Sequence, residues 1–469
     1  VQNRIDNQKA PITFLPWLIS VNSFMYFVSG CMILHSILVT ILILPVSKLK
    51  KQKWINYAIS KYAKSVIYSG PHVRKNISGK ENIHVDKPVI FIANHTSFLD
   101  ILLVIMLHPK IVMMVKGWVY HSPFFGPIIR YAGYLHADDG AEENIEKMQK
   151  LIEQGYSLMV FPEGTRSENG KIGRFHKGAF HLAQVLNLEI QPILIHGAAE
   201  VLQKNNFLIR NGVLNVRVLP RIAVNDIRWG DTLRDKTKNI ATYFKSTFAK
   251  FQSEMEDTDY LKTRIFTNYV YKGPVLEWYF KAKWRLESKN FENYDRLIGQ
   301  RSYILDIGCG YGYLSFYLHY RNENRYIQGV DFDEDKITVA AHSYNKSDRL
   351  QFTAANIMNH AFSKQDVIFL NDVLHYLTAD QQEIILNRCV NALNPDGIIF
   401  IRDGVTDAEE KHKNTLRTES LSTGLFSFNK KENDFHTLHG LSISIQAHSK
   451  NTSNVLFILR KDAHQINQK

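Results

Sequence analysis

Apolar and polar positions follow a block pattern at the start of the chain. Residues 24–46 form an almost uninterrupted apolar run without a charge. As a helix, this run of 23 residues would be about 34 Å long, enough to cross a bilayer core of about 30 Å. A shorter apolar stretch at 12–21 precedes it across Asn22 and Ser23 and contains Pro16, which favours a separate interfacial or re-entrant arm.

Lysines follow the long apolar run at once, at Lys48, Lys50, Lys51 and Lys53. By the positive-inside rule this side faces the cytoplasm. We therefore expect residues 1–54 to anchor the chain at an inner (cytoplasmic) membrane, either as a spanning helix or as a hairpin lying on the surface. No small-residue cleavage site follows the apolar core, which disfavours a signal peptide. Because the chain starts at Val1, we expect either processing or an upstream portion.

The pattern then changes to short apolar runs separated by amphipathic stretches, as in an α/β domain, which we expect over residues 55–256. A helix is expected from Ser97 to Met106 and a charged one at 231–256. The strands that the pattern predicts are 88–93, 110–115, 157–161, 190–196 and 214–218.

The stretch 257–300, rich in aromatics and lysine, predicts a linker followed by a lid helix. From Tyr303 the alternation restarts, which predicts a doubly wound, Rossmann-like nucleotide-binding domain over 301–469. Its expected strands are 303–307, 326–330, 350–353, 366–370 and 398–402, with a turn at 394–397 and two paired strands, 442–447 and 455–459, at the end of the sheet.

Composition narrows the possible partners. The 469 residues are enough for about three units, and a hydrophobic content of 45% allows full cores. The net charge of +12 calls for an anionic partner. We find no zinc-ligand spacing, arginine-rich arm or RNA-recognition signature, so we expect anionic membrane lipid and no nucleic acid. The three cysteines, Cys31, Cys309 and Cys389, suggest neither a disulfide framework nor a metal site, which fits a reducing cytoplasm.

A first candidate site begins where the strand at 88–93 meets the following helix. His95 and Asp100 lie there, five positions apart, as a general base and its orienting carboxylate require. The segment 161–166, Phe-Pro-Glu-Gly-Thr-Arg, follows another apolar strand, so a carboxylate and a guanidinium should meet at the same edge of the sheet. The alternative is a helix-capping Asn94 beside an incidental histidine.

With Phe-His-Lys-Gly-Ala at 175–179, this set resembles the 1-acylglycerol-3-phosphate acyltransferases, a family of glycerolipid acyltransferases, over roughly 82–251. The resemblance implies that His95 removes the proton of an acceptor hydroxyl as it attacks a thioester of coenzyme A or acyl-carrier protein, while Asp100 orients the imidazole. It implies a catalytic or acceptor-binding role for Glu163. The acceptor-binding residues that we expect are Gly164, Thr165, Arg166, Lys116 and Lys177.

The sequence departs from this family in one place. The family often carries an arginine after Gly-x-Ile-x-Ile-Asp, and the matching segment 133–138 is followed by Asp139. An acid thus replaces an anion-binding side chain. We expect an O-acyltransferase whose acceptor lacks a phosphate at the usual place.

A second candidate site is the glycine-rich loop 306–312, Asp-Ile-Gly-Cys-Gly-Tyr-Gly, after the strand at 303–307. With Asp331 at the end of the next strand, it resembles the class I S-adenosylmethionine-dependent methyltransferases over roughly 260–461. The resemblance places Asp306 near the amino-acid part of the cofactor, Asp331 on the ribose hydroxyls and Asn356 on the adenine. The cofactor-binding residues that we expect are Asp306, Gly308, Gly310, Gly312, Asp331, Asn356 and Asp372.

His375, after the fourth strand, is the candidate methyl-transfer base, although a packing role fits it equally. The sequence as a whole predicts a membrane-associated bifunctional transferase that tailors a bacterial lipid or polyene pigment. Two alternatives stay open. One is a housekeeping 1-acylglycerol-3-phosphate acyltransferase with an independent or inactive methyltransferase domain, and the other is a membrane scaffold that senses S-adenosylmethionine.

Overall fold

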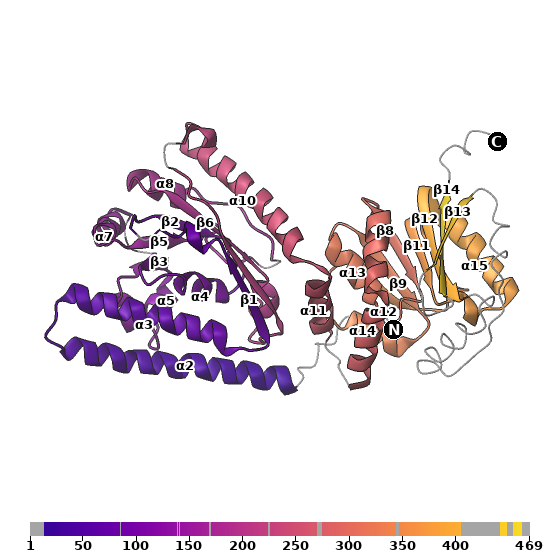
Figure 1. Cartoon of the computed structure of the whole chain (residues 1–469), viewed down its shortest axis with the longest axis horizontal. Helices are drawn as coiled ribbons and strands as arrows, with labels where there is room; N and C mark the ends of the chain where they lie inside the picture. The colour runs from indigo at the N-terminus through magenta and orange to yellow at the C-terminus, as the bar shows by residue number, and fades with distance from the viewer. Residues whose placement is uncertain are drawn as a thin grey trace. The chain divides into compact units, whose positions relative to one another are not determined.

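The computed structural model forms two compact units, one spanning Ile12–Arg264 and the other beginning at Ile265 (Figure 1). The residues that the structure describes are 14–84, 86–137, 139, 141–167, 170–223, 226–269, 274–343, 347–404, 441–447 and 454–461.

The first unit begins with two long helices, α2 (Phe14–Ile43) and α3 (Lys48–Ser69). Helix α2 runs without interruption through Asn22 and Ser23, so the expected separate arm at 12–21 is wrong. Pro16 lies in the first turn of α2, where a missing N–H leaves no helical hydrogen bond unmade. The Ser20 hydroxyl donates to the Pro16 carbonyl within the helix, at 2.6 Å.

Helix α2 packs along α3, and this packing explains its length. The Tyr62 hydroxyl of α3 donates to the Phe27 carbonyl, and Gly30 faces the Tyr62 ring so closely that a Cβ there would lie 2.1 Å from it. Lys51 donates to the Leu42 carbonyl at 2.7 Å, near the carboxyl end of α2, where a cation is favourable. The apolar side of α2 that faces away from this packing remains exposed, including Phe24, Met25, Met32, Ile33 and Ile43.

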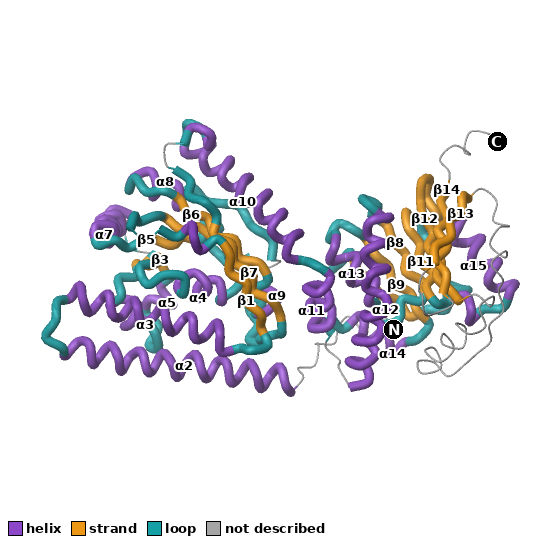
Figure 2. Tube along the Cα trace, in the orientation of Figure 1, coloured by secondary structure: helices purple, strands orange, loops and turns teal. Residues whose placement is uncertain are grey.

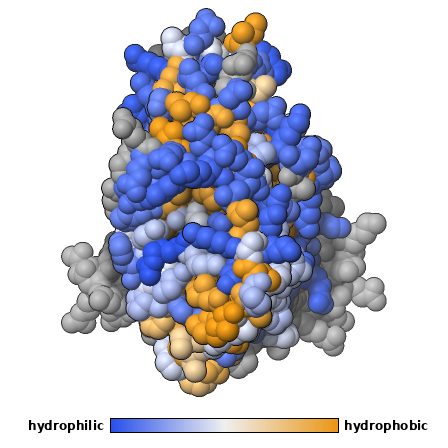
Figure 3. All heavy atoms as spheres, turned by 90° about the vertical axis from the view of Figure 1, so that its left-hand side faces the viewer, coloured by the Kyte–Doolittle hydropathy of each residue, from blue (hydrophilic) through white to orange (hydrophobic). Residues whose placement is uncertain are grey.

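By length and composition α2 is the one helix among the described residues that could cross a bilayer. Apolar side chains also gather at the lower end of the face drawn in Figure 3, the level at which α2 and α3 lie in Figure 1.

The sheet of the first unit has the strand order β1-β7-β6-β2-β5-β3-β4. Strands β6 and β7 are antiparallel and the other pairs are parallel, so β2, β5, β3 and β4 end at the same edge. The short strand β2 is buried along its whole length, as a parallel strand covered on both faces should be. The strands are β1 (Val73–Ser78), β2 (Ile90–Ala93), β3 (Ile111–Val115), β4 (Leu135–His136), β5 (Ser157–Val160), β6 (Ile190–His196) and β7 (Gly212–Val218).

Helices connect these strands and cover the sheet (Figure 2). They are α4 (Leu99–Ile105), α5 (Gly117–Tyr120), α6 (Gly126–Tyr131), α7 (Ala141–Glu153), α8 (Gly178–Val185), α9 (Ala198–Val201) and α10 (Leu233–Met255), followed by α11 (Thr258–Asn268).

The sheet of the second unit has the order β10-β9-β8-β11-β12-β14-β13. The strands are parallel from β10 to β12, and β14 is antiparallel to both its neighbours. This is the expected doubly wound plan, with a switch in strand order between β8 and β11, where such folds bind ligands. Its elements are α12 (Pro274–Ile298), β8 (Tyr303–Ile307), α13 (Tyr313–Arg321), β9 (Tyr326–Asp331), α14 (Glu334–Ala341), β10 (Leu350–Ala354), β11 (Gln365–Asn371), α15 (Ala379–Ala392), β12 (Leu393–Gly404), β13 (Leu441–Ala447) and β14 (Asn454–Lys461).

The strands predicted from the sequence are confirmed to within about two residues at most ends, but β1 and β4 were not predicted. One predicted strand also differs in its start. Strand β12 begins at Leu393 and runs through the expected turn at 394–397. Its register against β11 shifts there, and Asp396 has a φ of 60°. The turn residues therefore form an irregular start to the strand.

Candidate active sites

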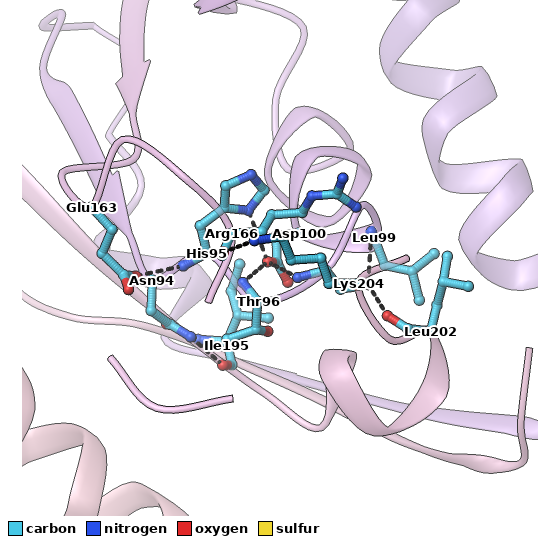
Figure 4. Close-up of polar contacts among 11 residues, drawn as sticks. Asn94, His95, Thr96, Leu99, Asp100, Glu163, Arg166, Ile195, Leu202 and Lys204 are labelled. Atoms are coloured by element: carbon cyan, nitrogen blue, oxygen red, sulfur yellow. Dashed lines mark hydrogen bonds and ion pairs between the residues drawn. The ribbon is translucent and has the colours of Figure 1, made fainter. Parts of the chain in front are cut away.

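The first site is built around His95, which follows β2. Its Nδ1 atom lies 3.1 Å from Oδ2 of Asp100, a fully buried residue in the first turn of α4 (Figure 4). The same oxygen accepts the backbone N–H groups of Thr96 and Ser97, at 2.6 and 2.7 Å. A carboxylate only accepts hydrogen bonds, so Nδ1 donates and the neutral imidazole keeps the lone pair of Nε2 for a substrate proton.

Glu163, three residues beyond the end of β5, accepts hydrogen bonds from two backbone N–H groups. One carboxylate oxygen accepts the backbone N–H of His95 at 2.8 Å, and the other accepts that of Gly173 at 2.6 Å. Burial raises the pKa of Glu163, and these two hydrogen bonds oppose that rise. Because both carboxylate oxygens accept backbone N–H groups, the geometry favours a positioning role for Glu163 over the catalytic role expected from sequence.

The loop after Glu163 is hydrogen-bonded to the backbone of His95. The Ser167 N–H donates to the His95 carbonyl at 2.8 Å, and the Lys204 ammonium donates to the Arg166 carbonyl at 3.0 Å. Lys204, from the segment between α9 and β7, was missed by sequence reasoning because nothing local links it to Arg166. Of the other expected acceptor residues, Gly164 has a φ of 70°, and Thr165, Lys116 and Lys177 are exposed.

Asp139 lies just beyond β4, at the same sheet edge. His136 Nδ1 donates to one of its oxygens at 3.0 Å, and Lys147 of α7 donates to the other at 2.9 Å. The Asn144 amide donates to the Asp139 carbonyl at 3.2 Å. The hydrogen bonds from Lys147 and His136 hold the pKa of Asp139 below its usual range. The position where the resembled family carries an arginine is therefore a fixed carboxylate.

The second site begins at the glycine loop after β8. The Gly310 N–H donates to one oxygen of Asp331 at 2.7 Å, and the Asp333 N–H donates to the other at 3.0 Å. Gly308 and Gly312 both have positive φ, and a Cβ at either would lie within 2.5 Å of a neighbouring side chain. Only glycine therefore fits this turn.

Asp306 is buried beneath the loop, and the Ser315 hydroxyl donates to it at 2.5 Å. Burial raises the pKa of Asp306 to about 7, although the Ser315 hydrogen bond lowers it. A carboxyl group held at this point can change its charge when a cationic ligand group arrives.

Asp372 follows β11 with a φ of 56° and joins a cluster of four charges. Its carboxylate pairs with Arg402 of β12 and, at 3.1 Å, with Lys283 of α12, and both cations also pair with Glu287. Burial alone would raise the pKa of Asp372, but Arg402 and Lys283 hold it below its usual range. These contacts favour a structural role, and cofactor binding by Asp372 remains a prediction. The same holds for exposed Asn356, which accepts the Met358 N–H.

His375 has a carboxylate partner that sequence reasoning missed. Its Nδ1 atom lies 2.9 Å from Oδ1 of Asp403, near the end of β12, and Asp403 Oδ2 accepts the His375 N–H. Both side chains are almost fully buried. The arrangement repeats that of His95 and Asp100 in an unrelated fold.

A family model described as acyltransferase matches residues 74–196, and one described as methyltransferase domain matches residues 299–451. The chain thus carries an acyltransferase domain followed by a methyltransferase domain. His95 and Asp100 lie in the first matched range, and the loop at 306–312 lies in the second.

The acyltransferase domain is 29% identical over 177 residues to the chloroplastic 1-acyl-sn-glycerol-3-phosphate acyltransferase LPAT1 of Arabidopsis thaliana, covering 36% of this chain and 48% of that protein. The chain thus spans about half the length of this curated relative. Among solved structures, it is similar to the 1-acyl-sn-glycerophosphate acyltransferase PlsC of Thermotoga maritima, at 21% identity and a TM-score of 0.46, over 52% of this chain and all of that one. Human N-acetylserotonin methyltransferase matches 39% of this chain and 54% of its own, at 16% identity and a TM-score of 0.32.

One further cluster in the acyltransferase domain has metal-like geometry. Ligand atoms of His196, Glu200 and Glu256 lie within 4.8 Å of one another. Arg264 pairs with both carboxylates, at 3.1 and 3.4 Å, and Tyr260 donates to Glu200 at 2.7 Å. The guanidinium already supplies the positive charge that a metal would bring, so we assign no metal here.

Proposed function

We propose that the acyltransferase domain transfers an acyl group from a thioester of coenzyme A or acyl-carrier protein to a hydroxyl of a lipid acceptor. The contact between His95 and Asp100 carries this proposal. The acceptor oxygen attacks the thioester carbonyl carbon while its proton passes to Nε2 of His95, and Asp100 stabilises the imidazolium. The carbon–sulfur bond then breaks, and the imidazolium returns the proton to the leaving thiolate.

The two N-terminal helices support a membrane-bound lipid acceptor. The Phe27 ring of α2 meets the Phe98 ring, within the His95–Asp100 segment, edge to face at 5.7 Å. The Ile209 N–H donates to the Ser20 hydroxyl at 2.8 Å. Because α2 packs along the catalytic unit at both places, we favour a hairpin lying in the membrane surface over a free spanning helix. Its exposed apolar face would enter the lipid, and Lys48–Lys53 would meet anionic head groups at the cytoplasmic side.

Asp139 supports an acceptor that carries no phosphate at this end of the site. Strands β2, β5, β3 and β4 end side by side, so Asp139 and His95 lie along one sheet edge. An anionic head group reaching β4 would face a fixed carboxylate, and Lys147, which pairs with it, is shared with Glu143. This argues against the housekeeping lysophosphatidate reaction.

For the second domain we propose transfer of the S-adenosylmethionine methyl group to an oxygen of the acceptor. The residues fit the cofactor. Buried Asp306 can lose its proton and pair with an ammonium group. Asp331 accepts a hydrogen bond from the glycine loop and so fixes the loop that would close on the nucleoside. The cofactor would supply a methyl group activated by a sulfonium. His375, oriented by Asp403, would take the acceptor proton, which an oxygen acceptor needs more than an amine does.

The fusion supports successive modification of one membrane-associated product, since linked sites raise the effective concentration of an intermediate. We place the enzyme in lipid or polyene-pigment tailoring at a bacterial inner membrane, with both domains facing the cytoplasm. The two histidine–aspartate pairs, in each of which a carboxylate holds the Nδ1 atom of the histidine, argue against a scaffold that only senses the cofactor.

Lipid extracts test the proposal in cells that express the full chain. We expect a product heavier by one acyl chain and one methyl group. His95→Ala should remove the acylated product, and Asp331→Ala should remove the methyl increment while acylation persists. Full acyl transfer by His95→Ala would refute the acyltransferase assignment. Binding of NAD in place of S-adenosylmethionine would refute the methyltransferase assignment.

A further inference from the structure

The face of the His95 imidazole is covered by an aromatic ring. The Phe161 ring lies parallel to it, with ring centroids 3.9 Å apart and an interplanar angle of 16°. Phe161 directly follows β5, which pairs with β2 in a register that sets Val160 beside Ile92. The two rings therefore leave neighbouring strands close to the same level, and the sheet itself brings them together.

Two contacts at right angles define the position of the imidazole. Asp100 holds its Nδ1 edge and so fixes rotation within the ring plane. Phe161 covers one face and so prevents the ring from tilting out of that plane. When both rotation and tilting of the imidazole are restricted, Nε2 keeps one orientation toward the acceptor hydroxyl. A hydrogen bond to Nδ1 alone does not ensure this.

The Phe161 ring also interacts with the positive charge of a protonated His95 imidazole. The face of an aromatic ring is electron-rich and attracts a cation within about 6 Å of its centroid. The His95 ring is neutral before the reaction and becomes an imidazolium as it takes the acceptor proton. Phe161 therefore interacts more strongly with the state in which the proton has moved, which is the condition for an interaction to accelerate a step.

We propose that Phe161 is a positioning residue of acyl transfer that aligns the His95 imidazole and stabilises the imidazolium formed as the acceptor hydroxyl attacks the thioester. This inference rests on the proposed role of His95 as the base. It adds a residue to which neither the motif nor its spacing assigns a role.

Charged groups from several elements surround His95, and a substitution of Phe161 replaces none of them. Asp100 comes from α4, Glu163 and Arg166 come from the loop after β5, and Lys204 comes from the segment after α9 (Figure 4). A change in pH dependence on replacing Phe161 alone therefore reports on the ring.

Kinetics of the full chain in lipid vesicles test the proposal. Phe161→Leu keeps an apolar side chain but removes the ring, whereas Phe161→Tyr keeps it. For Phe161→Leu we expect kcat to fall about tenfold with KM within twofold. The acid limb of the kcat/KM profile should move to lower pH by about half a unit, because the protonated imidazole loses its cation–π partner. Phe161→Tyr should keep both the rate and the profile.

Phe244→Leu is the matched control, since Phe244 is a fully buried ring of α10 in the same domain. It should lower the melting temperature and leave the pH profile unchanged. A shifted profile in this control, or wild-type kinetics in Phe161→Leu, would overturn the inference while leaving the role of His95 intact.

A measurement without turnover separates the inference from the proposed function. With histidine-labelled protein, the His95 Hε1 resonance, assigned by its loss in His95→Ala, should be shifted upfield by the Phe161 ring current. It should return toward the ordinary histidine position in Phe161→Leu. An unshifted wild-type resonance would overturn the stacking. An absence of acyl transfer with a shifted resonance would overturn the proposed reaction and the role of Phe161 in it, and would leave only the stacking.

Discussion

The imidazole of His375 and the carboxylate of Asp403 meet at 2.9 Å, although 28 positions separate them in the chain. His375 follows β11 and Asp403 lies near the end of β12, and these parallel strands are neighbours in the sheet. The carboxylate fixes the tautomer of the imidazole and, in the proposed role of His375 as a base, would balance the charge of the protonated ring.

Replacing Asp403 with Asn should lower kcat for methyl transfer about 100-fold or more, because an amide can favour the wrong tautomer and balances no charge. The affinity for S-adenosylmethionine should change less than twofold. Radiolabelled methyl transfer into a lipid extract measures the rate, and calorimetry measures the affinity. Asp366→Asn, at the opposite end of β11, is the control and should affect stability alone. Equal rates for Asp403→Asn and the wild type would remove His375 from the mechanism.

The pKa of about 7 for Asp306 predicts a pH-dependent affinity for S-adenosylmethionine. Burial keeps the carboxyl protonated below that pH, whereas the cofactor's ammonium group favours the ionised form. The dissociation constant should therefore fall as pH rises toward 7, by at most about tenfold per unit, and then level off. Calorimetry in buffers of different ionisation enthalpy should detect proton release on binding. Asp306→Asn should bind weakly with a flat pH profile, and a sloping profile in that variant would contradict the assignment.

The same shift has a consequence for the unliganded protein. The folded state holds the Asp306 proton more tightly than the unfolded chain, whose carboxyl titrates near the ordinary value. The methyltransferase unit should lose stability as pH rises from about 4 through 7, and the loss should be complete above 7. The midpoint of urea unfolding, measured against pH for the wild type and Asp306→Asn, checks this sign.

Replacing Asp139 with Arg should restore a cation at the end of β4. We expect kcat/KM for lysophosphatidate to rise about tenfold relative to a monoacylglycerol of the same chain length, since charge-assisted contacts to phosphate are strong. Glu146→Arg makes the same kind of charge change on the exposed side of α7, where Glu146 pairs with Lys150, and should leave the preference unchanged. A wild-type enzyme that already prefers lysophosphatidate would refute the proposed acceptor class.

Replacing Arg402 with Met should destabilise the methyltransferase unit strongly. The variant leaves the buried carboxylates of Asp372 and Glu287 with Lys283 as the remaining cation of the cluster. Removing one partner of such a buried ion pair lowers the free energy of unfolding by about 3–5 kcal/mol. Arg321→Met, which removes a more exposed pair with Asp295, should cost less than about 1 kcal/mol. Denaturant unfolding measures both, and similar losses for the two variants would contradict the structural role of the cluster.

Local patterns predicted the parts of the two sites that lie close together in sequence. His95 and Asp100 share one strand-to-helix junction, so their spacing alone indicates that they meet. Asp403 and Lys204 come from later segments, and their partners follow from the order of strands in each sheet, which one sequence does not specify. The roles of the individual residues remain predictions.

In the N-terminal helix, by contrast, a local sequence signal predicts a break that the structure does not have. Asn22 and Ser23 favour a break by propensity, but the cost per residue is well below 1 kcal/mol. Packing of α2 against α3 exceeds that cost, through contacts such as that between Gly30 and Tyr62. A polar pair within an apolar run therefore says little about where a helix ends once a partner helix covers it.

The carboxylate of Glu163 links two separate backbone segments of the acyltransferase domain. One side chain holds the backbone of the base and the backbone at Gly173, at the far end of the loop that follows Arg166. A shift of the backbone at Gly173 would be passed through Glu163 to the backbone of His95, the proposed base. Under the proposed mechanism, recognition of the acceptor and alignment of the base would be coupled through this one carboxylate.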